Sequence, residues 1–542
     1  MLSSTLHYGV RVCSLLASCL FGTLAFAGDL PPADRPISRV IDDSIQSQLK
    51  QQKITPAPQI DDANLIRRLT LDLVGRIPTP LETEQFIATK ESNKREQLVD
   101  RLMQLTEFVD HQVNEFDWLL MQGSGSLREY LQTAFKEERS WERMFRELIS
   151  LKEDDKGKIP VDFVKQRVKD LDRLTNDVSS IFFGVNISCA QCHDHPLAPD
   201  WKQEHFYGLK SFLNRTYDNG GFLGEREYGN VSFLTPKGEQ RQAHLMFLTG
   251  KRIEEPEAKE PNNDAKKKEQ ELLKELATKK QPPPKPSFSR REQLVSVALE
   301  PDQRHFFARS IVNRLWYRLI GYGLVMPVDQ MHSGNPASHP ELLDWLARDM
   351  ADHQFNLARL IRGIALSETY SRSSRWEKGD RPLSSTFAVA DVRPLTPYQY
   401  GSALRIATTD PEVWPKLKYP VEFSQRTASI SGSGRAWASL FQPVGDNFQI
   451  GVSEPLMFAN DERVAKELLT DSGDRILLRL KELPSPEEQV RCAVSTVLGR
   501  PATNDEVTAL AKYLASRSDR KIEALQQVLW SLLTSSEFRF NY

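Results

Sequence analysis

Apolar residues recur at helical spacing along most of the chain. One such stripe, ended by Gly75, consists of Leu65, Ile66, Leu69 and Leu73. Residues three or four positions apart share one face of a helix, so each stripe predicts a helix that buries this face in a core. Similar stripes predict helices over 40–49, 98–105, 116–120, 141–149, 290–299, 305–319, 342–346, 356–366, 398–406, 462–469, 475–483, 487–498, 505–516 and 521–533.

Several predicted helices begin at recognisable start signals. Thr79-Pro80 and Thr396-Pro397 each place a hydroxyl side chain directly before a proline. Proline is favoured in the first turn of a helix, and threonine can cap the free backbone N–H groups there. Ser338-His339-Pro340 is predicted to start another helix. His339 is expected to have a structural role there, as a capping or core histidine.

One region departs from the helical pattern. Glycines punctuate residues 217–250 around the short apolar run Val231–Leu234, which predicts a small β excursion. The Gly/Ser-rich segment Ser429–Gly434 predicts a loop, followed by an irregular stretch up to Glu454. The chain has no long β alternation, so the predicted class is mainly α: a multi-helical protein of two domains.

The predicted domain boundary is a charged, proline-rich linker. Residues 251–287 are dense in Lys and Glu and end in Pro282-Pro283-Pro284-Lys285-Pro286. We expect a solvated helix over 264–280 and an extended spacer after it. The resulting domains are 40–250, which contains the motif described below, and 288–540.

The first 27 residues are predicted to be a signal peptide. They hold one basic residue, Arg11, an apolar stretch over 12–26, and Ala25-Phe26-Ala27 before Gly28. This small-x-small ending is the pattern that signal peptidase cleaves, so we expect a protein exported to the periplasm or cell envelope. Leu16-Ala17-Ser18-Cys19 resembles a lipobox, which would leave a lipid anchor on Cys19; the apolar run continuing past Cys19 disfavours it.

Composition excludes several classes of protein. The 542 residues include 71 Lys+Arg and 73 Asp+Glu, for a net charge of −2. This balance gives no support for nucleic-acid binding, which requires a basic excess. A mean hydropathy of −0.47 excludes a polytopic membrane protein, and no integral membrane segment is expected after signal cleavage.

The sequence contains one motif with specific chemistry. Cys189-Ala190-Gln191-Cys192-His193 is C-x-x-C-H, the attachment pattern of c-type haem. Two cysteines three positions apart on a helical turn can form thioethers to one porphyrin, and His193 can then be the axial ligand of the iron. Because haem c is attached outside the cytoplasm, the motif and the signal peptide support each other. The predicted cofactor site is Cys189, Cys192 and His193.

Two other interpretations of the motif remain open. The cysteines could form a disulfide or a redox-active dithiol, or they could bind zinc together with His193 and His195. The favoured role for His195 is a hydrogen bond in a turn. Cys492 lies in an apolar helix and is expected to be an inert buried thiol. Candidates for a sixth iron ligand are His111, His205, Met246, Met331 and His332.

The motif leads to an electron-transfer hypothesis, with two alternatives. One is a non-haem binding or assembly protein of the cell envelope, in which the cysteine pair is a disulfide or structural metal site. The other is an enzyme acting on extracellular polysaccharide, for which no acid/base pair stands out among the many carboxylates. Whether the protein is an enzyme, and which redox partner it meets, stay open.

Two long segments carry a family resemblance. Residues 66–86 and 179–216 resemble the planctomycete cytochrome-associated domain of unknown function. Residues 307–350 and 357–374 resemble its usual C-terminal companion, a planctomycete-specific domain also of unknown function. The resemblance implies an exported, mostly helical bacterial protein, described as cytochrome-like because of the C-x-x-C-H, without an established reaction. The companion domain often carries a cysteine near its end, and the matching stretch here, 448–461, has none.

Overall fold

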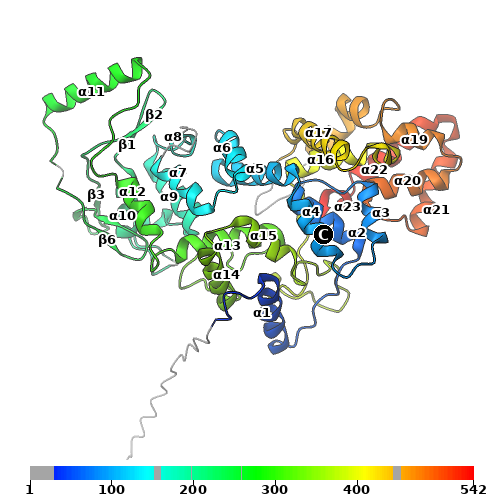
Figure 1. Ribbon diagram of the computed structural model, residues 1–542, viewed down its shortest axis with the longest axis horizontal. Coiled ribbons are helices and arrows are strands. Elements are labelled where there is room, and N and C mark those ends of the chain that lie inside the picture. Colours follow the sequence, from blue (N-terminus) through cyan, green and yellow to red (C-terminus); the bar gives the residue numbers. More distant parts are fainter. Residues whose placement is uncertain (1–29, 152–159, 197, 258, 443–452) are drawn as a thin grey trace, which may run out of the picture.

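The chain folds into a helical protein with short β hairpins (Figure 1). The computed structural model describes residues 30–151, 160–196, 198–257, 259–442 and 453–542. The predicted signal peptide, 1–27, lies outside the described residues, as does most of the irregular stretch before Glu454. The structure is 57% helical with few short strands, which confirms the mainly α class.

The first part of the chain supplies the helices around the cysteine motif and most of the centre of the molecule. These elements are α1 (Ile37–Gln51), α2 (Asp62–Val74), α3 (Pro80–Ala88), α4 (Lys94–Met103), α5 (Thr106–Met121), α6 (Arg128–Lys136), α7 (Trp141–Ser150), α8 (Asp162–Lys165), α9 (Leu171–Phe183), the 3₁₀ turn η1 (Ser188–Gln191) and α10 (Gln203–Leu213).

The second part supplies α11 (Asn263–Thr278), α12 (Arg290–Ala298), α13 (His305–Ile320), α14 (Pro340–Asp352), α15 (Leu357–Ala365), η2 (Ser384–Thr386), α16 (Pro397–Ala407), η3 (Pro411–Lys416), α17 (Val421–Ala438), α18 (Ser453–Asn460), the π-helix η4 (Val464–Leu468), α19 (Ile476–Glu482), α20 (Pro486–Leu498), α21 (Asn504–Ser516), η5 (Ser518–Arg520), α22 (Lys521–Leu533) and α23 (Ser536–Arg539). The helix predicted over 462–469 is therefore largely a π-helix.

The predicted start signals are confirmed by the caps. The Thr79 side chain accepts a hydrogen bond from the Glu82 backbone N–H, and the Glu82 carboxylate accepts one from the Thr79 N–H. This reciprocal capping box satisfies two backbone donors that the first turn of α3 leaves without helical partners. Thr396 and Gln399 repeat the arrangement at α16. Gly75 ends α2 in the left-handed conformation, with φ of 71°.

The predicted β excursion is confirmed as three antiparallel hairpins. They pair β1 (Thr216–Asn219) with β2 (Phe222–Glu225), β3 (Ser232–Leu234) with β4 (Gln240–Gln242), and β5 (Leu245–Met246) with β6 (Arg252–Ile253). A fourth pair, β7 (Arg393–Pro394) with β8 (Phe540–Asn541), joins two segments far apart in sequence.

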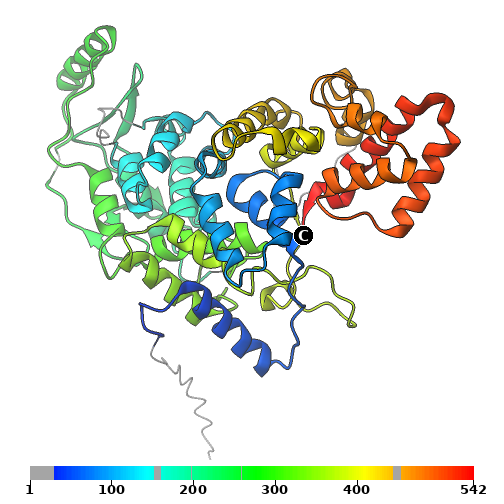
Figure 2. The ribbon, with the colours of Figure 1, turned by 45° about the vertical axis from the view of Figure 1, so that its right-hand side comes forward.

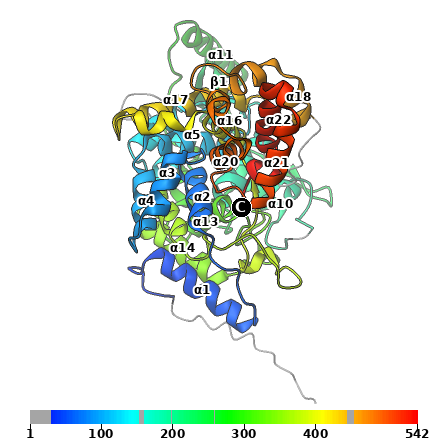
Figure 3. The same ribbon diagram turned by 90° about the vertical axis from the view of Figure 1, so that its right-hand side faces the viewer.

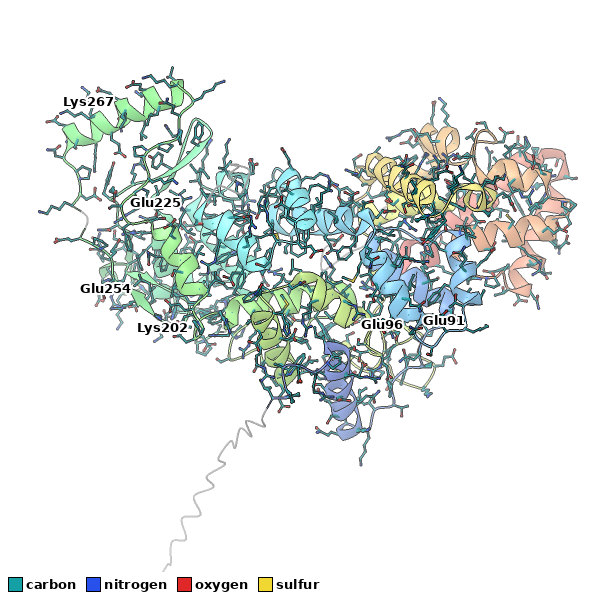
Figure 4. All side chains as sticks on the ribbon, viewed as in Figure 1. Glu91, Glu96, Lys202, Glu225, Glu254 and Lys267 are labelled. Carbon is teal, nitrogen blue, oxygen red and sulfur yellow. The ribbon has the colours of Figure 1, made fainter. Side chains whose placement is uncertain are left out.

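The charged segment 251–287 projects from the fold, and its two ends lie close together. Its helix α11 is exposed almost throughout, with Leu273 as its one buried residue, as expected of a solvated helix. The Arg290 guanidinium, just after the segment, bonds the Glu255 carboxylate at 2.6 and 2.9 Å. Figure 4 shows Lys267 on the projecting α11 and Glu225 nearer its base. The start and the end of the segment are thus joined by this ion pair, so the segment is a loop that projects from the fold rather than a linker between two separate bodies.

The hydrophobic packing is divided at a different place from the predicted linker. One cluster of buried side chains contains residues from Ile37 to Val389, on both sides of 251–287. The second contains Leu71, Ile77 and residues from Leu395 to Phe538. Figure 2 shows the orange and red C-terminal helices as a lobe beside the blue helices. The core therefore changes near residues 390–395, because the helices after 288 pack directly onto α7, α9 and α10.

The loop predicted at Ser429–Gly434 is wrong, because these residues lie inside α17. Their glycines serve close helix packing. A Cβ on Gly401 of α16 would lie 2.2 Å from the Gly434 carbonyl oxygen, and one on Gly434 would lie 2.6 Å from the Ser402 nitrogen. The two helices approach so closely that neither glycine can carry a side chain.

Helix α2 connects the two clusters, and its polar residues are buried with its apolar ones. The Asp72 carboxylate accepts two hydrogen bonds from Arg393, at 2.8 and 2.7 Å, one from the Tyr370 hydroxyl at 2.7 Å and one from the Asn541 amide at 2.9 Å. Arg68, on the same helix, donates to the backbone carbonyls of residues 370, 372 and 542. We call these five side chains, Arg68, Asp72, Tyr370, Arg393 and Asn541, the α2 polar hub.

Acid should destabilise the fold through His339, the residue before α14. Its side chain is 3% exposed, and burial lowers its pKa to about 4. The unfolded chain takes up a proton below about pH 6.5 and the folded chain does not, so stability falls as the pH drops from 6.5 toward 4. At pH 5 this loss is about 2 kcal/mol relative to pH 7.5. We expect His339→Gln to remove that part of the pH dependence in urea denaturation, whereas replacing the exposed His244 should not. An unchanged pH slope in His339→Gln would contradict the assignment.

Candidate functional site

The C-x-x-C-H motif forms an exposed turn between α9 and α10. Ser188–Gln191 is the 3₁₀ turn η1, and Cys192 and His193 follow it directly. Cys189, Cys192 and His193 are exposed, whereas Ala190 between the cysteines is buried. The structure therefore presents all three predicted cofactor ligands on one short segment, anchored by an apolar residue.

The backbone of this turn is fixed by α10. The Gln203 amide donates to the carbonyl oxygens of Gln191 and Cys192, at 3.3 and 3.2 Å, and to that of Leu234 at 3.0 Å. The Tyr207 hydroxyl also donates to the Gln191 carbonyl, at 3.1 Å. Gln203 and Tyr207 are four residues apart and so lie on one face of α10. Lys202, labelled in Figure 4, marks the start of this helix.

The other side of the turn is held by the second part of the chain. Val185 forms an antiparallel β bridge with Gln330, and the Asn186 N–H donates to the Asp329 carbonyl at 2.7 Å. Beyond the turn, the Asp200 carboxylate accepts from the Ser333 backbone N–H and hydroxyl, at 2.6 and 2.9 Å. The motif is thus placed by both halves of the sequence.

His193 has a defined tautomer in this arrangement. Its Nδ1 lies 2.7 Å from the carbonyl oxygen of Asp194. A carbonyl can only accept, so the ring donates its proton from Nδ1 and keeps the lone pair on Nε2. This is the state that a histidine needs in order to bind a metal through Nε2.

His195 makes the predicted turn hydrogen bond. Its Nδ1 accepts from the Ala198 N–H at 3.0 Å, and its own backbone N–H donates to the Trp201 carbonyl. Its ring lies 6.3 Å from that of His332, between centroids. Burial lowers the pKa of His195, and the neighbouring His332 and His193 lower it further. Three histidines therefore gather beside the cysteine turn.

The structure separates the five candidates for a sixth ligand. His332 lies at the site, and its Nδ1 is buried without a hydrogen-bond partner among the described residues. His205 packs on Trp201, and Met331 fills the space above Gly184, where a Cβ would lie 2.9 Å from its sulfur. Two candidates have other neighbours: Met246 packs against Gly208, and His111 against Gly75 at the end of α2.

An aromatic pair borders the turn on the α10 side. Tyr207 and Phe233 stack with ring centroids 4.5 Å apart and planes within 4° of parallel. Burial raises the pKa of Tyr207, and the charges of Asp172 and Cys192 raise it further. The sequence prediction missed Gln203, Tyr207 and Phe233. Gln203 and Tyr207 are four residues apart shortly after the motif, and this helical spacing could have indicated that both side chains face the turn.

The structure bears on the disulfide and zinc interpretations of the cysteine pair. Cys189 and Cys192 are both free thiols. Over the described ranges, no group of three or more His, Cys, Asp or Glu side chains is placed to hold a metal ion. Cys492 is half-buried, and burial raises the pKa of its thiol, which keeps it protonated. Among the described helices, none combines the length and apolar character needed to span a bilayer.

Loss of the Gln203 side chain should loosen the cysteine turn. Gln203→Ala removes a donor shared by three partly buried carbonyl oxygens, of which that of Gln191 keeps its bond from Tyr207, and the loss of such a hydrogen bond costs about 0.5–1.5 kcal/mol. We expect this decrease in the free energy of unfolding, measured by chemical denaturation. Gln97→Ala, at an exposed position, is the matched control and should change stability by less than about 0.5 kcal/mol. Equal effects of the two substitutions would contradict the role given to Gln203.

Comparison with known families places the site in two matched regions. Residues 40–218 match the model of a family described as a protein of unknown function, DUF1549 (PSCyt2). Residues 290–409 match that of another, DUF1553 (PSD1). No curated protein and no solved structure matches the chain. The two families occur in the order that the resemblance implied. The cysteine turn lies in the first match, and the segment 329–333 that supports it lies in the second.

Proposed function

We propose that this chain is an exported protein that carries one covalently bound c-type haem and takes part in electron transfer. The observation that carries the proposal is the exposed turn on which an intact C-x-x-C-H presents two free thiols beside His193. The name PSCyt2 of the matching family hints at an association with cytochromes.

The residues of the turn fit such a group chemically. Thioether formation requires free, accessible thiols, and both Cys189 and Cys192 are free and exposed. An axial histidine requires a lone pair on Nε2, which the hydrogen bond from Nδ1 to the Asp194 carbonyl provides. Cys189 and Cys192 would hold the porphyrin, and His193 would be an iron ligand.

The surrounding side chains have positioning roles. Gln203 and Tyr207 fix the carbonyl groups of the turn, so the two cysteines keep a constant spacing. The stacked rings of Tyr207 and Phe233 offer an apolar border on one side. When bound, the haem iron supplies one-electron transfer, and its potential depends on axial ligation and on exclusion of water.

Export is part of the same proposal. Haem c is attached outside the cytoplasm, and the signal-peptide pattern of residues 1–27 would bring the chain there. A periplasmic or cell-envelope location follows from the two together. In that oxidising compartment, two exposed thiols without haem are expected to oxidise to a disulfide.

The test is a pyridine haemochrome spectrum of the full-length protein, made with and without the cytochrome c maturation machinery. We expect the α band of a c-type haemochrome only with the machinery, and we expect the colour to stay with the protein after acid–acetone extraction. A colourless product with two titratable thiols under both conditions would overturn the proposal.

A second candidate is a non-haem envelope protein in which Cys189 and Cys192 form a disulfide. Both cysteines are exposed, so an oxidant can reach both thiols. This candidate predicts no visible absorbance and no free thiol at the motif in periplasmic protein, with thiols appearing after mild reduction.

A further inference from the structure

A groove lies between α1 and the start of α14. Figure 3 shows α1 directly below α14, and the two helices are in contact. The groove has a volume of about 500 Å³ and is partly open to solvent. Sites for small molecules usually have volumes of about 300–1,000 Å³, so the groove is large enough for a ligand.

One wall of the groove is a stripe of uncharged polar side chains on α1. The stripe consists of Ser44, Ser47, Gln48 and Gln51. These positions are three or four residues apart, so they lie on one face of the helix. Hydroxyl and amide side chains can both donate and accept hydrogen bonds. Ser47 and Gln51 are exposed, so a ligand in the groove can reach them.

Hydrogen bonds tie the two sides of the groove together. The Gln48 amide on α1 donates to the Ser338 carbonyl, just before α14, at 3.2 Å. The Trp345 indole N–H on α14 donates to the Pro31 carbonyl, in the segment before α1, at 2.8 Å. The groove is therefore preformed in the folded chain. The buried side chains that line it are largely apolar: Val40, Leu342 and Trp345.

The charged side chains of the groove favour an uncharged ligand. Arg35 forms a salt bridge with Asp43 at 2.6 Å, so these two charges largely cancel. Glu341 adds a second carboxylate on the α14 side. An anionic ligand would face two carboxylates against one arginine, and a cationic ligand would face that arginine. A neutral ligand meets neither repulsion, and the carboxylates can accept hydrogen bonds from its hydroxyl groups.

We infer that the groove between α1 and α14 binds a neutral, hydroxyl-rich ligand, namely a short oligosaccharide. Each sugar hydroxyl both donates and accepts hydrogen bonds, as the Ser and Gln side chains of the α1 stripe do. The C–H faces of the sugar rings can pack on the apolar side chains that line the groove. This inference is independent of the haem.

Isothermal titration of the full-length protein with maltotriose, cellotriose and xylotriose tests the inference. We expect binding of at least one of these neutral trisaccharides at millimolar concentration or below. Trigalacturonate, an acidic trisaccharide, should bind at least about tenfold more weakly, because its carboxylates would face Asp43 and Glu341. The double variant Ser47→Ala, Gln51→Ala should weaken binding by about tenfold or more, since two hydrogen-bonding side chains are lost. Both positions are exposed and alanine favours a helix, so the variant should fold.

The double variant Arg39→Ala, Lys50→Ala is the matched control, because both residues are exposed on α1 and neither lines the groove. It should bind as tightly as the wild type. Absence of binding to all three neutral trisaccharides would overturn the inference, as would equal affinity for trigalacturonate. Unchanged affinity in Ser47→Ala, Gln51→Ala, or an equal loss in the control variant, would also overturn it, since any binding would then occur elsewhere.

Discussion

The double variant Cys189→Ala, Cys192→Ala is expected to contain no covalently bound haem when it is produced with the maturation machinery. Both thioether sulfurs are lost, and His193 alone cannot retain a porphyrin through denaturation. Because both cysteines are exposed and only Ala190 of the turn is buried, the fold should change little in stability. Haem stain on a denaturing gel, together with the Tm of the same sample, measures both effects.

The chain supplies its own control for this experiment. Cys492→Ala removes the third cysteine of the described chain, which is half-buried on α20. It should keep the full haem content of the wild type. Haem retained in the double variant, or lost equally in Cys492→Ala, would remove the basis for assigning the cofactor to the motif.

Replacing Asp72 with alanine should cause the largest loss of stability, about 3–5 kcal/mol, because it leaves the Arg393 charge buried without its carboxylate. Asp72 accepts from Arg393, Tyr370 and Asn541 within the α2 polar hub. These partners come from three segments that are distant in sequence, two of which pair as β7 and β8. The free energy of unfolding from urea denaturation measures the loss.

Asp62→Ala, on the same helix, is the matched control. Asp62 pairs with Lys94 at 2.6 Å, and both side chains are partly exposed to solvent. Exposed ion pairs contribute little, so we expect a loss below about 1 kcal/mol. A similar loss in both variants would show that Asp72 acts only through its own helix and not by joining the two clusters.

Local signals in the sequence were sufficient for most of the helices. Thr79, Gly75 and Thr396 act through neighbours within four residues, so the sequence shows both the cap and the helix that it limits. No local sequence pattern indicated the α2 polar hub. Apolar spacing placed one face of α2 in a core, but Arg68 and Asp72 are buried because segments 300 or more residues away cover the other face.

Glycine-rich composition misled the prediction at α17 for a related reason. Glycine favours a loop when only neighbouring residues are considered. At Gly434 its role is set by α16, whose backbone lies where any side chain would be. A sequence alone does not show which helix will pack there.

The sequence draws attention to the cysteine turn but not to the residues that support it. The C-x-x-C-H spacing marks Cys189, Cys192 and His193 as a candidate site, because this spacing is the pattern of haem attachment. The contact of His332 with His195 and the bridge from Val185 to Gln330 depend on the docking of the second matched region. These contacts became visible only with the fold.

The most direct test of the account is the intact mass of the exported protein, purified after production with the maturation machinery and measured under denaturing conditions. The account predicts a chain beginning at Gly28 whose mass exceeds that of the polypeptide by one haem. A mass equal to that of the reduced polypeptide, or lower by the two hydrogen atoms of a disulfide, would contradict it.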